Sequence, residues 1–144
     1  MTRASSSAMP LWSVMDQRAR IVLADLLKAD IPASPGVYAL YRDDQRVYVG
    51  KAASLCDRIW KNHCGRGAVM TGSALRRNIA EHLKIASSAD IKARRYRPTA
   101  DEIAAVRLWL DGCEVAWIER VSQQAAEQHE GALKAEYMPL LTKR

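Results

Sequence analysis

The fold of this chain is decided by two neighbouring stretches, PGVYALY at residues 35–41 and RVYVGK at residues 46–51. Both are rich in β-branched and aromatic residues, so they predict two strands, Gly36–Tyr41 and Arg46–Gly50, joined by a tight turn. Each strand carries one glycine and one tyrosine, in mirrored order. Phenols and glycines at the ends of a hairpin are unusual in a plain core, and they suit a site where backbone and hydroxyl approach a ligand closely.

The length of the turn decides whether Tyr38 and Tyr48 lie on the same face of this hairpin. Side chains alternate between the two faces along a strand. A three-residue loop over 43–45 places both phenols on one face, whereas a two-residue turn places them on opposite faces. Asp43 and Asp44 suit the turn because aspartate tolerates turn backbone. The residues leave both turn lengths open, and only the three-residue loop is expected to place the two phenols on one face.

Length and composition indicate one domain with a proper hydrophobic core. The chain has 144 residues, of which 49% are hydrophobic, and such a chain buries enough apolar surface to fold alone. No apolar run approaches the ~20 residues that a membrane span needs, and the first residues lack the basic-then-apolar order of a secretory signal. We therefore expect a soluble, cytoplasmic protein with no membrane partner.

The three cysteines, Cys56, Cys64 and Cys113, form no CxxC pair, and no set of cysteines and histidines has the spacing of a zinc site. They are interpreted as small buried or half-buried thiols in a reducing compartment.

The charge balance favours a polyanionic partner. Lysine and arginine outnumber aspartate and glutamate by 22 to 16, which gives a net charge of +6. The positive residues cluster in two places, and the second cluster includes Tyr96, which suits phosphate contact combined with base stacking. A solvated basic loop explains that cluster equally well. The candidate nucleic-acid-binding residues are Arg76, Arg77, Lys92, Arg94, Arg95 and Arg97.

Hydrophobic spacing and capping signals place the other elements around the hairpin. The pattern predicts an α+β fold with a small, mainly antiparallel three-stranded sheet flanked by helices. In chain order we expect a loose tail at 1–10, helices at 16–28 and 54–63, helices opened by Thr71 or Ser73 and by Thr99, a central strand at 115–118, and a last helix from Ser122 to about Tyr137.

Glu130 lies on the apolar stripe of the last helix, which Ala126, Leu133 and Tyr137 define. A carboxylate on a stripe that faces the core costs several kcal/mol unless it is paired, hydrogen-bonded or bound to a metal. One interpretation is therefore a functional carboxylate. The other is a structural ion pair, for instance with Arg58, and the residues alone weigh the two about equally.

The order of these features resembles the GIY-YIG nuclease family. The two triplets stand here as Gly36-Val37-Tyr38 and Tyr48-Val49-Gly50, followed one helix later by Arg58 and on the last helix by Glu130. The likeness extends over about 35–64 and 114–142, and the first part is similar to the incision domain of the bacterial excision-repair nuclease. Each triplet alone is weak evidence, but their spacing and order together form a specific signal.

This resemblance implies hydrolysis of phosphodiester bonds at one divalent metal ion. Glu130 becomes the single protein ligand of Mg²⁺ or Mn²⁺, hard cations that prefer oxygen ligands and keep much of their water. Tyr48 positions or deprotonates the attacking water and Tyr38 supports it. Arg58 neutralises the charge that builds on the phosphate. The implied catalytic residues are thus Tyr38, Tyr48, Arg58 and Glu130.

Some positions support or depart from the family pattern. The supporting residues are Gly36, Gly50, Lys51, His63 and Thr142. Thr142 stands twelve residues after Glu130, where many members carry asparagine, and a hydroxyl is a less versatile group than an amide. His63 lies one position after the place where some restriction enzymes of the family carry histidine.

The stretch from about 65 to 112 is longer than in a minimal module and is interpreted as a helical insertion that shapes substrate binding. The resulting domain division is 1–34 for a tail and helix and 35–144 for the nuclease-like domain.

The expected function is a metal-dependent endonuclease acting on DNA, although the sequence does not separate DNA from RNA. One alternative is a nucleic-acid-binding module that kept the fold and lost turnover, for which Thr142 is the hint. A second is a protein-interaction domain that uses the old cleft. No second domain that would supply sequence specificity is visible, which favours a structure-selective enzyme, a homodimer or a protein partner. Repair, restriction and mobile-element roles all fit.

Overall fold

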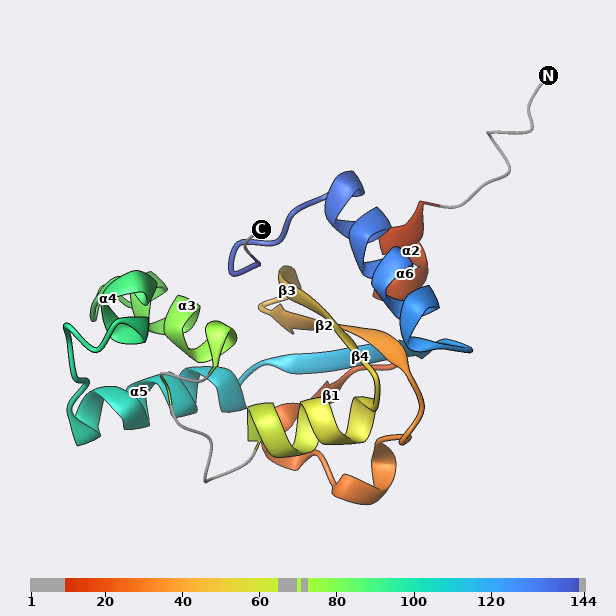
Figure 1. Cartoon of the computed structure of the whole chain (residues 1–144). Coiled ribbons are helices and arrows are strands. Elements are labelled where there is room, and N and C mark those ends of the chain that lie inside the picture. The colour runs from red at the N-terminus through yellow and green to blue at the C-terminus, as the bar shows by residue number, and fades with distance from the viewer. Residues whose placement is uncertain (1–9, 65–69, 71–72, 143–144) are drawn as a thin grey trace.

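The chain folds into an α+β structure built on a four-stranded antiparallel sheet, seen in the computed structural model in Figure 1. The structure describes residues 10–64, 70 and 73–142, without the side chains of 62–64. The strand order in the sheet is β1-β4-β2-β3. The strands are β1 (Ile21–Val22), β2 (Gly36–Arg42), β3 (Gln45–Ala52) and β4 (Glu114–Glu119).

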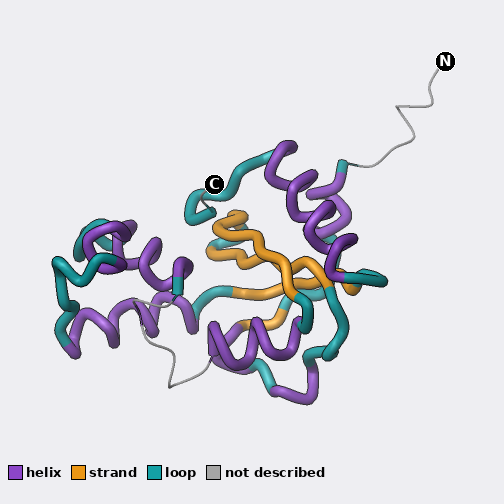
Figure 2. Tube along the Cα trace, in the orientation of Figure 1, coloured by secondary structure: helices purple, strands orange, loops and turns teal. Residues whose placement is uncertain are grey.

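Helices cover both faces of this sheet. Two of them, α2 (Leu11–Asp16) and α6 (Gln123–Glu136), lie on one face, as Figures 1 and 2 show. The short turns η1 (Leu23–Asp25) and η2 (Lys28–Asp30) and the π-helical η3 (Asp57–Cys64) lie on the other. Three further helices extend from one end of the sheet: α3 (Ala74–His82), α4 (Ser88–Lys92) and α5 (Ala100–Asp111).

Two apolar clusters fill the space between the sheet and its helices. The alternation of side chains along β2 sends Tyr38 and Leu40 into the larger cluster, which η3, α3 and α5 complete. It sends Val37, Ala39 and Tyr41 into the smaller cluster under α2 and α6. A strand buried on both faces explains why six of the seven residues of β2 are buried.

The hairpin between β2 and β3 has a two-residue turn, for which the sequence predicts that the two phenols lie on opposite faces, and that prediction is wrong. Asp43 and Asp44 both have positive φ, 51° and 63°, as in the primed turns that match the twist of paired strands. The phenols nevertheless share a face, because the register shifts by one residue: Tyr41 pairs with Arg46, but Leu40 pairs with Tyr48. The extra residue forms a β-bulge that restores the alternation.

The sheet has one strand more than the sequence predicts, and the helix expected at 16–28 is wrong. The helix ends at Asp16, and Ile21 and Val22 instead pair with Val115 and Glu114 on the outer edge of β4. Ile21 and Val22 are β-branched and form backbone hydrogen bonds with the edge of β4. This pairing stabilises a strand more than the helical spacing of apolar residues stabilises a helix. The strand expected at 115–118 is confirmed as an interior strand between β1 and β2.

The expected helix starts are confirmed. Ser73, Thr99 and Ser122 each accept a hydrogen bond from a backbone N–H in the first turn of their helix, and Thr99 forms a full capping box with Glu102. The helix expected at 54–63 is also present, and the Asp57 N–H donates to Ser54 Oγ at 3.3 Å. Among the described residues no helix is long and apolar enough to cross a membrane.

The C-terminal segment covers the outer edge of β3. The Leu141 N–H donates to the Val47 carbonyl at 2.8 Å, and the Val49 N–H donates to Thr142 Oγ1 at 2.9 Å. The side chain of Asn78 on α3 donates to the Leu141 carbonyl at 2.8 Å. The segment thus satisfies an edge that would otherwise present unpaired backbone groups, and it brings α3 next to β3.

Candidate active site

The centre of the candidate site is a pair of phenols from adjacent strands. Tyr38 of β2 and Tyr48 of β3 have ring centroids 6.2 Å apart at an interplanar angle of 41°. A side-chain hydrogen bond joins them. Tyr38 is 1% exposed, whereas Tyr48 is half-buried and lines an open pocket. The inner phenol therefore supports the outer one.

The glycines of the two triplets make room for protein groups. Gly50 pairs across the strands with Tyr38, and a Cβ on Gly50 would lie 2.6 Å from both Cζ and Oη of Tyr38. A Cβ on Gly36 would lie 2.6 Å from the Ile118 carbonyl oxygen and from Leu55 Cδ1. The close approach expected at these glycines is therefore real, but the groups that approach are Tyr38 and the backbone of β4.

The two phenols differ in how readily they lose a proton. Burial raises the pKa of Tyr38 well above its usual value, and the neighbouring Tyr48 raises it further. Burial also raises the pKa of Tyr48, but the hydrogen bond with Tyr38 opposes that shift. Both phenols are therefore protonated at neutral pH, and Tyr48 is the one that ionises first, with Tyr38 as the donor to its oxygen.

Arg58 and Glu130 reach the same pair of phenols from two different helices. The charges of both residues act on Tyr38 and on Tyr48, with Arg58 favouring the phenolate and Glu130 opposing it. Arg58 is exposed on η3, whereas the side chain of Glu130 on α6 is only 13% exposed. The charges of Arg58 and Glu130 thus both act on the phenol pair, and the catalytic roles of the four residues stay predictions.

Glu130 has an ion-pair partner that the sequence prediction missed. Lys134 Nζ lies 3.4 Å from Glu130 Oε1, one helical turn further along α6. The spacing of four residues was the available signal, because such pairs meet on a helix surface. The pair with Arg58 that the sequence offered as a structural explanation is not the one seen.

An open pocket of about 440 Å³ lies against Tyr48, Glu130 and Lys134. One side is formed by β3, α6 and the C-terminal segment and the other by α3 and α4. The residues around it are Tyr48, Val49, Ala74, Arg77, Asn78, Glu81, Ser88, Ala89, Lys92, Glu130, Lys134 and Thr142. Thr142 lines the pocket, although its hydroxyl already accepts from the Val49 N–H.

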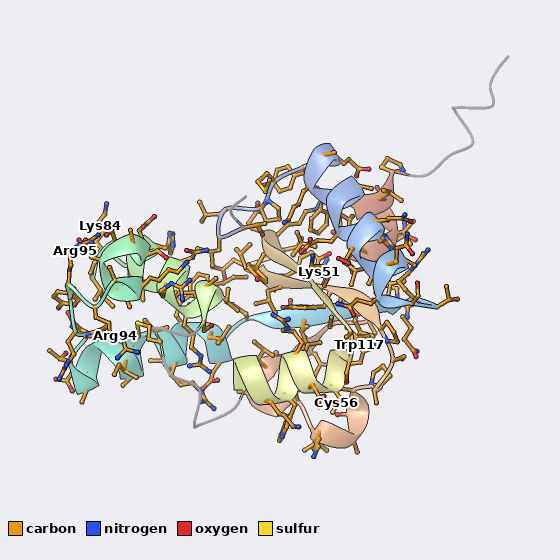
Figure 3. All side chains as sticks on the ribbon, in the orientation of Figure 1. Lys51, Cys56, Lys84, Arg94, Arg95 and Trp117 are labelled. Carbon is orange, nitrogen blue, oxygen red and sulfur yellow. The ribbon has the colours of Figure 1, made fainter. Side chains whose placement is uncertain are left out.

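Two other supporting residues lie apart from this pocket or outside the description. Lys51 is exposed, and its Nζ lies 3.5 Å from Glu127 Oε2 on α6; Figure 3 labels Lys51. His63 belongs to η3, and its side chain lies outside the described part of the structure.

The predicted basic residues separate into three groups. Arg77 and Lys92 line the pocket. Arg94 and Arg97 line a smaller pocket of about 190 Å³ with Tyr96, while Arg95 pairs with Asp90 at 2.9 Å. In Figure 3 Arg94 and Arg95 lie at the far end of the helical extension. Arg76 is 4% exposed and is therefore not a surface residue.

Among the described residues there is no group of three or more histidines, cysteines, aspartates or glutamates that could hold a metal ion together. Glu130 is the carboxylate that the sequence motif predicts as a metal ligand. In the structure its neighbouring cation is the ammonium group of Lys134. Of the cysteines, Cys56 and Cys113 are free thiols, half-buried and buried.

Comparison with known proteins gives matches among solved structures. No family model matches the chain, and no curated protein does. The matching structures are of the GIY-YIG N-terminal endonuclease domain of UvrC from Thermotoga maritima. A point mutant bound to its catalytic divalent cation has 19% identity and a TM-score of 0.44, over 79% of this chain and 88% of that one. The magnesium-bound form has 18% identity and a TM-score of 0.43, over 78% and 88%. The present chain is similar in structure to this domain.

Proposed function

We propose that this protein is a divalent-metal-dependent endonuclease that hydrolyses phosphodiester bonds in DNA. The observation that supports the proposal is the Tyr38–Tyr48 pair, on which the charges of Arg58 and Glu130 both act, with Tyr48 and Glu130 lining one open pocket. These residues come from two strands and two helices, and the motif order that resembles the GIY-YIG nucleases named the same four. A phenol pair, a guanidinium and a carboxylate are the groups that phosphodiester hydrolysis needs.

Tyr48 is the residue suited to activate the attacking water. Tyr48 lines the pocket, and Tyr38 stabilises the ionised form of Tyr48 by donating a hydrogen bond. In the proposed reaction the ionised form of Tyr48 orients the water and accepts its proton, while the new P–O bond forms and the P–O bond to the leaving oxygen breaks. Tyr38, buried and protonated, stays in place and keeps the oxygen of Tyr48 aligned.

Arg58 and Glu130 act on the charges of the phosphate. The planar fork of Arg58 binds the non-bridging oxygens and neutralises the charge that grows on them. Glu130 fits a hydrated Mg²⁺ or Mn²⁺, because it is a hard oxygen donor at the pocket wall that already attracts one cation, the ammonium of Lys134. When bound, such a cation supplies Lewis-acid stabilisation of the leaving oxygen.

One observation favours a second candidate function, a nucleic-acid-binding module without turnover. Lys134 forms an ion pair with Glu130, and the hydroxyl of Thr142 already accepts a hydrogen bond from the Val49 N–H of β3. Both features compete with roles in catalysis. The binding surface remains in this alternative, since Arg77 and Lys92 still line the pocket.

A cleavage assay separates the two functions. Supercoiled plasmid, linear duplex, branched and single-stranded DNA are incubated with the protein in Mg²⁺, in Mn²⁺ and in EDTA. The nuclease proposal predicts cleavage of at least one of these substrates that depends on the metal. Salt-dependent binding with no cleavage in either metal would establish the binding module instead. Binding that hardly depends on salt would favour a protein-interaction domain.

A further inference from the structure

The pocket has two walls of different origin. Tyr48 and Glu130 belong to the wall made of β3 and α6, which carries the proposed chemistry. The opposite wall is made by α3 and α4, which lie in the stretch between η3 and β4. Two cations of that stretch, Arg77 and Lys92, face into the pocket, and neither has a role in the reaction described above.

Arg77 is held in position by the turn between α3 and α4. Its Nε donates to Ser88 Oγ at 3.3 Å, and the Ser88 N–H donates to Glu81 Oε1 at 2.8 Å. Ser87 in turn caps α4 by accepting from the Asp90 N–H. A half-buried guanidinium oriented in this way loses little further side-chain freedom when it binds a phosphate.

Lys92 completes this wall from the last turn of α4. Its side chain is exposed, and no described carboxylate forms an ion pair with it. Around the pocket three cations, Arg77, Lys92 and Lys134, outnumber two carboxylates, Glu81 and Glu130. The pocket lining therefore carries a net positive charge, which suits an anion.

The pocket has room for more than one phosphate. Its volume of about 440 Å³ lies within the range of small-molecule sites. We propose that Arg77 and Lys92 form a second phosphate subsite, which holds a phosphate next to the scissile one in the same strand. The inference rests on the proposed function and names its substrate class: a nucleic-acid strand with an adjacent phosphodiester, not an isolated diester.

Binding without metal tests the subsite separately from catalysis. Affinity for a short fluorescent oligothymidylate is measured in EDTA as a function of salt, for wild type and for Arg77→Gln with Lys92→Gln. The double variant should bind roughly tenfold more weakly, and its log–log salt slope should be shallower by about 1.4, since each phosphate contact contributes about 0.7 for a single strand. Lys28→Gln with Lys84→Gln is the control, because it removes two exposed positive charges outside the pocket.

If the substitution of Arg77 disturbs the fold of α3, the single variant Lys92→Gln still tests the subsite. Lys92 is exposed, so its substitution leaves the fold intact, and a slope reduced by about 0.7 is expected. Unchanged affinity and slope in both variants would overturn the subsite, as would an equal loss in the control.

Catalysis then distinguishes the subsite from the function on which it rests. In metal-dependent cleavage of the oligonucleotide, the double variant should raise KM more than it lowers kcat, because the subsite binds substrate and takes no part in the chemical step. If wild type binds the oligonucleotide through these residues but cleaves nothing, the nuclease proposal fails and the subsite stands. If wild type cleaves and the variants bind normally, the subsite alone fails.

Discussion

At the scale of single residues, the Tyr38–Gly50 pair explains the mirrored glycines and tyrosines of the hairpin. The ring of Tyr38 fills the space that a side chain at position 50 would need. The glycine of one strand therefore positions the tyrosine of the other, and Tyr38 in turn supports Tyr48 through their hydrogen bond.

The substitution Gly50→Ala should displace Tyr38 without unfolding the chain. The added methyl group would lie 2.6 Å from the phenol, so the ring must shift and its hydrogen bond to Tyr48 is lost. Misplacement on this scale typically costs on the order of 100-fold in rate. The measurement is plasmid nicking, with near-UV circular dichroism as the report on the tyrosines.

Gly131→Ala is the matched control for this prediction. Gly131 is exposed on α6 beside Glu130, and a Cβ there has nothing within 4 Å. The control should retain activity and gain up to about 1 kcal/mol of helix stability. If Gly50→Ala is as active as this control, the tyrosine position does not depend on the glycine.

The protonation state of Tyr48 should determine how the rate of plasmid nicking depends on pH. Burial raises the pKa of Tyr48, so the phenol is protonated at neutral pH and its ionised fraction increases as the pH rises. If Tyr48 takes the proton of the water, the nicking rate should rise about tenfold per pH unit from about pH 7 to 9. Tyr48→Phe should remove both the activity and this slope. A flat wild-type profile, with the chemical step rate-limiting, would contradict the role given to Tyr48.

The sequence motifs named Tyr38, Tyr48, Arg58 and Glu130, and in the structure the charges of Arg58 and Glu130 act on the two phenols, while the catalytic roles stay predictions. Lys134 was missed, although its distance of four residues from Glu130 is the usual ion-pair spacing on a helix. The contact of Thr142 with the Val49 N–H was not predictable, since it depends on how the C-terminal segment lies along β3.

At the scale of elements, the bulge in β3 is what makes the phenol pair possible. A regular hairpin with the same two-residue turn would send Tyr48 to the face of α2 and α6. Bulges leave no clear mark in a single sequence, and this explains why a two-residue turn was wrongly predicted to place the phenols on opposite faces. From the sequence it was possible to say that the two phenols must share a face, but not whether they do.

The first helix is a second element whose position depends on distant contacts. Glu136 of α6 accepts hydrogen bonds from the Leu11 and Trp12 N–H groups, at 2.8 and 2.9 Å. Trp12 Nε1 donates to the Leu133 carbonyl at 2.9 Å. These tertiary contacts place the helix before Asp16, which no local pattern of apolar residues indicates.

Asp16 anchors α2 to the hairpin, and its substitution should destabilise the fold. Tyr41 Oη donates to Asp16 Oδ1 at 2.6 Å, and Arg46 forms an ion pair with the same carboxylate. Asp16→Asn should cost about 1–3 kcal/mol in the free energy of unfolding at neutral pH. Denaturant titration measures this cost, and Asp25→Asn, at an exposed position, is the control.

The same carboxylate predicts a pH dependence of stability. Burial opposes the ionisation of Asp16, but hydrogen bonds from Arg46 and Tyr41 outweigh it and lower its pKa. A lowered folded-state pKa gives stability that is complete above the unfolded value and is lost as the pH falls through the folded value. The difference between wild type and Asp16→Asn should therefore shrink below about pH 4. A difference that stays constant from neutral pH into that range would contradict this account.

At the scale of the whole molecule, positive charge is distributed over two separate regions of the helical extension. Composition predicted a polyanionic partner, but not which basic residues face the pocket. Arg76 and Arg77 are neighbours, and a helix turns about 100° between them, so one is buried and the other lines the pocket. That outcome depends on how α3 packs against α5 and the sheet.

The distal basic residues should contribute to affinity for long duplexes. Arg94→Ala with Arg95→Ala removes two exposed charges far from Lys51, as Figure 3 shows. Duplex binding should weaken at every sequence, and the salt slope should flatten by up to about 1.8. Hydrolysis of a small diester should not change. Unaltered duplex affinity, compared with Lys28→Ala as the control, would show that this loop is not part of the nucleic-acid surface.

The central claim is that Glu130 is the carboxylate through which one metal-dependent site works. The most direct measurement is the initial rate of supercoiled plasmid nicking in Mg²⁺ by wild type and by Glu130→Gln, with DNA binding measured in parallel. The account predicts a loss on the order of 1,000-fold or more in rate with affinity largely retained. A Glu130→Gln variant that nicks plasmid at the wild-type rate would contradict it.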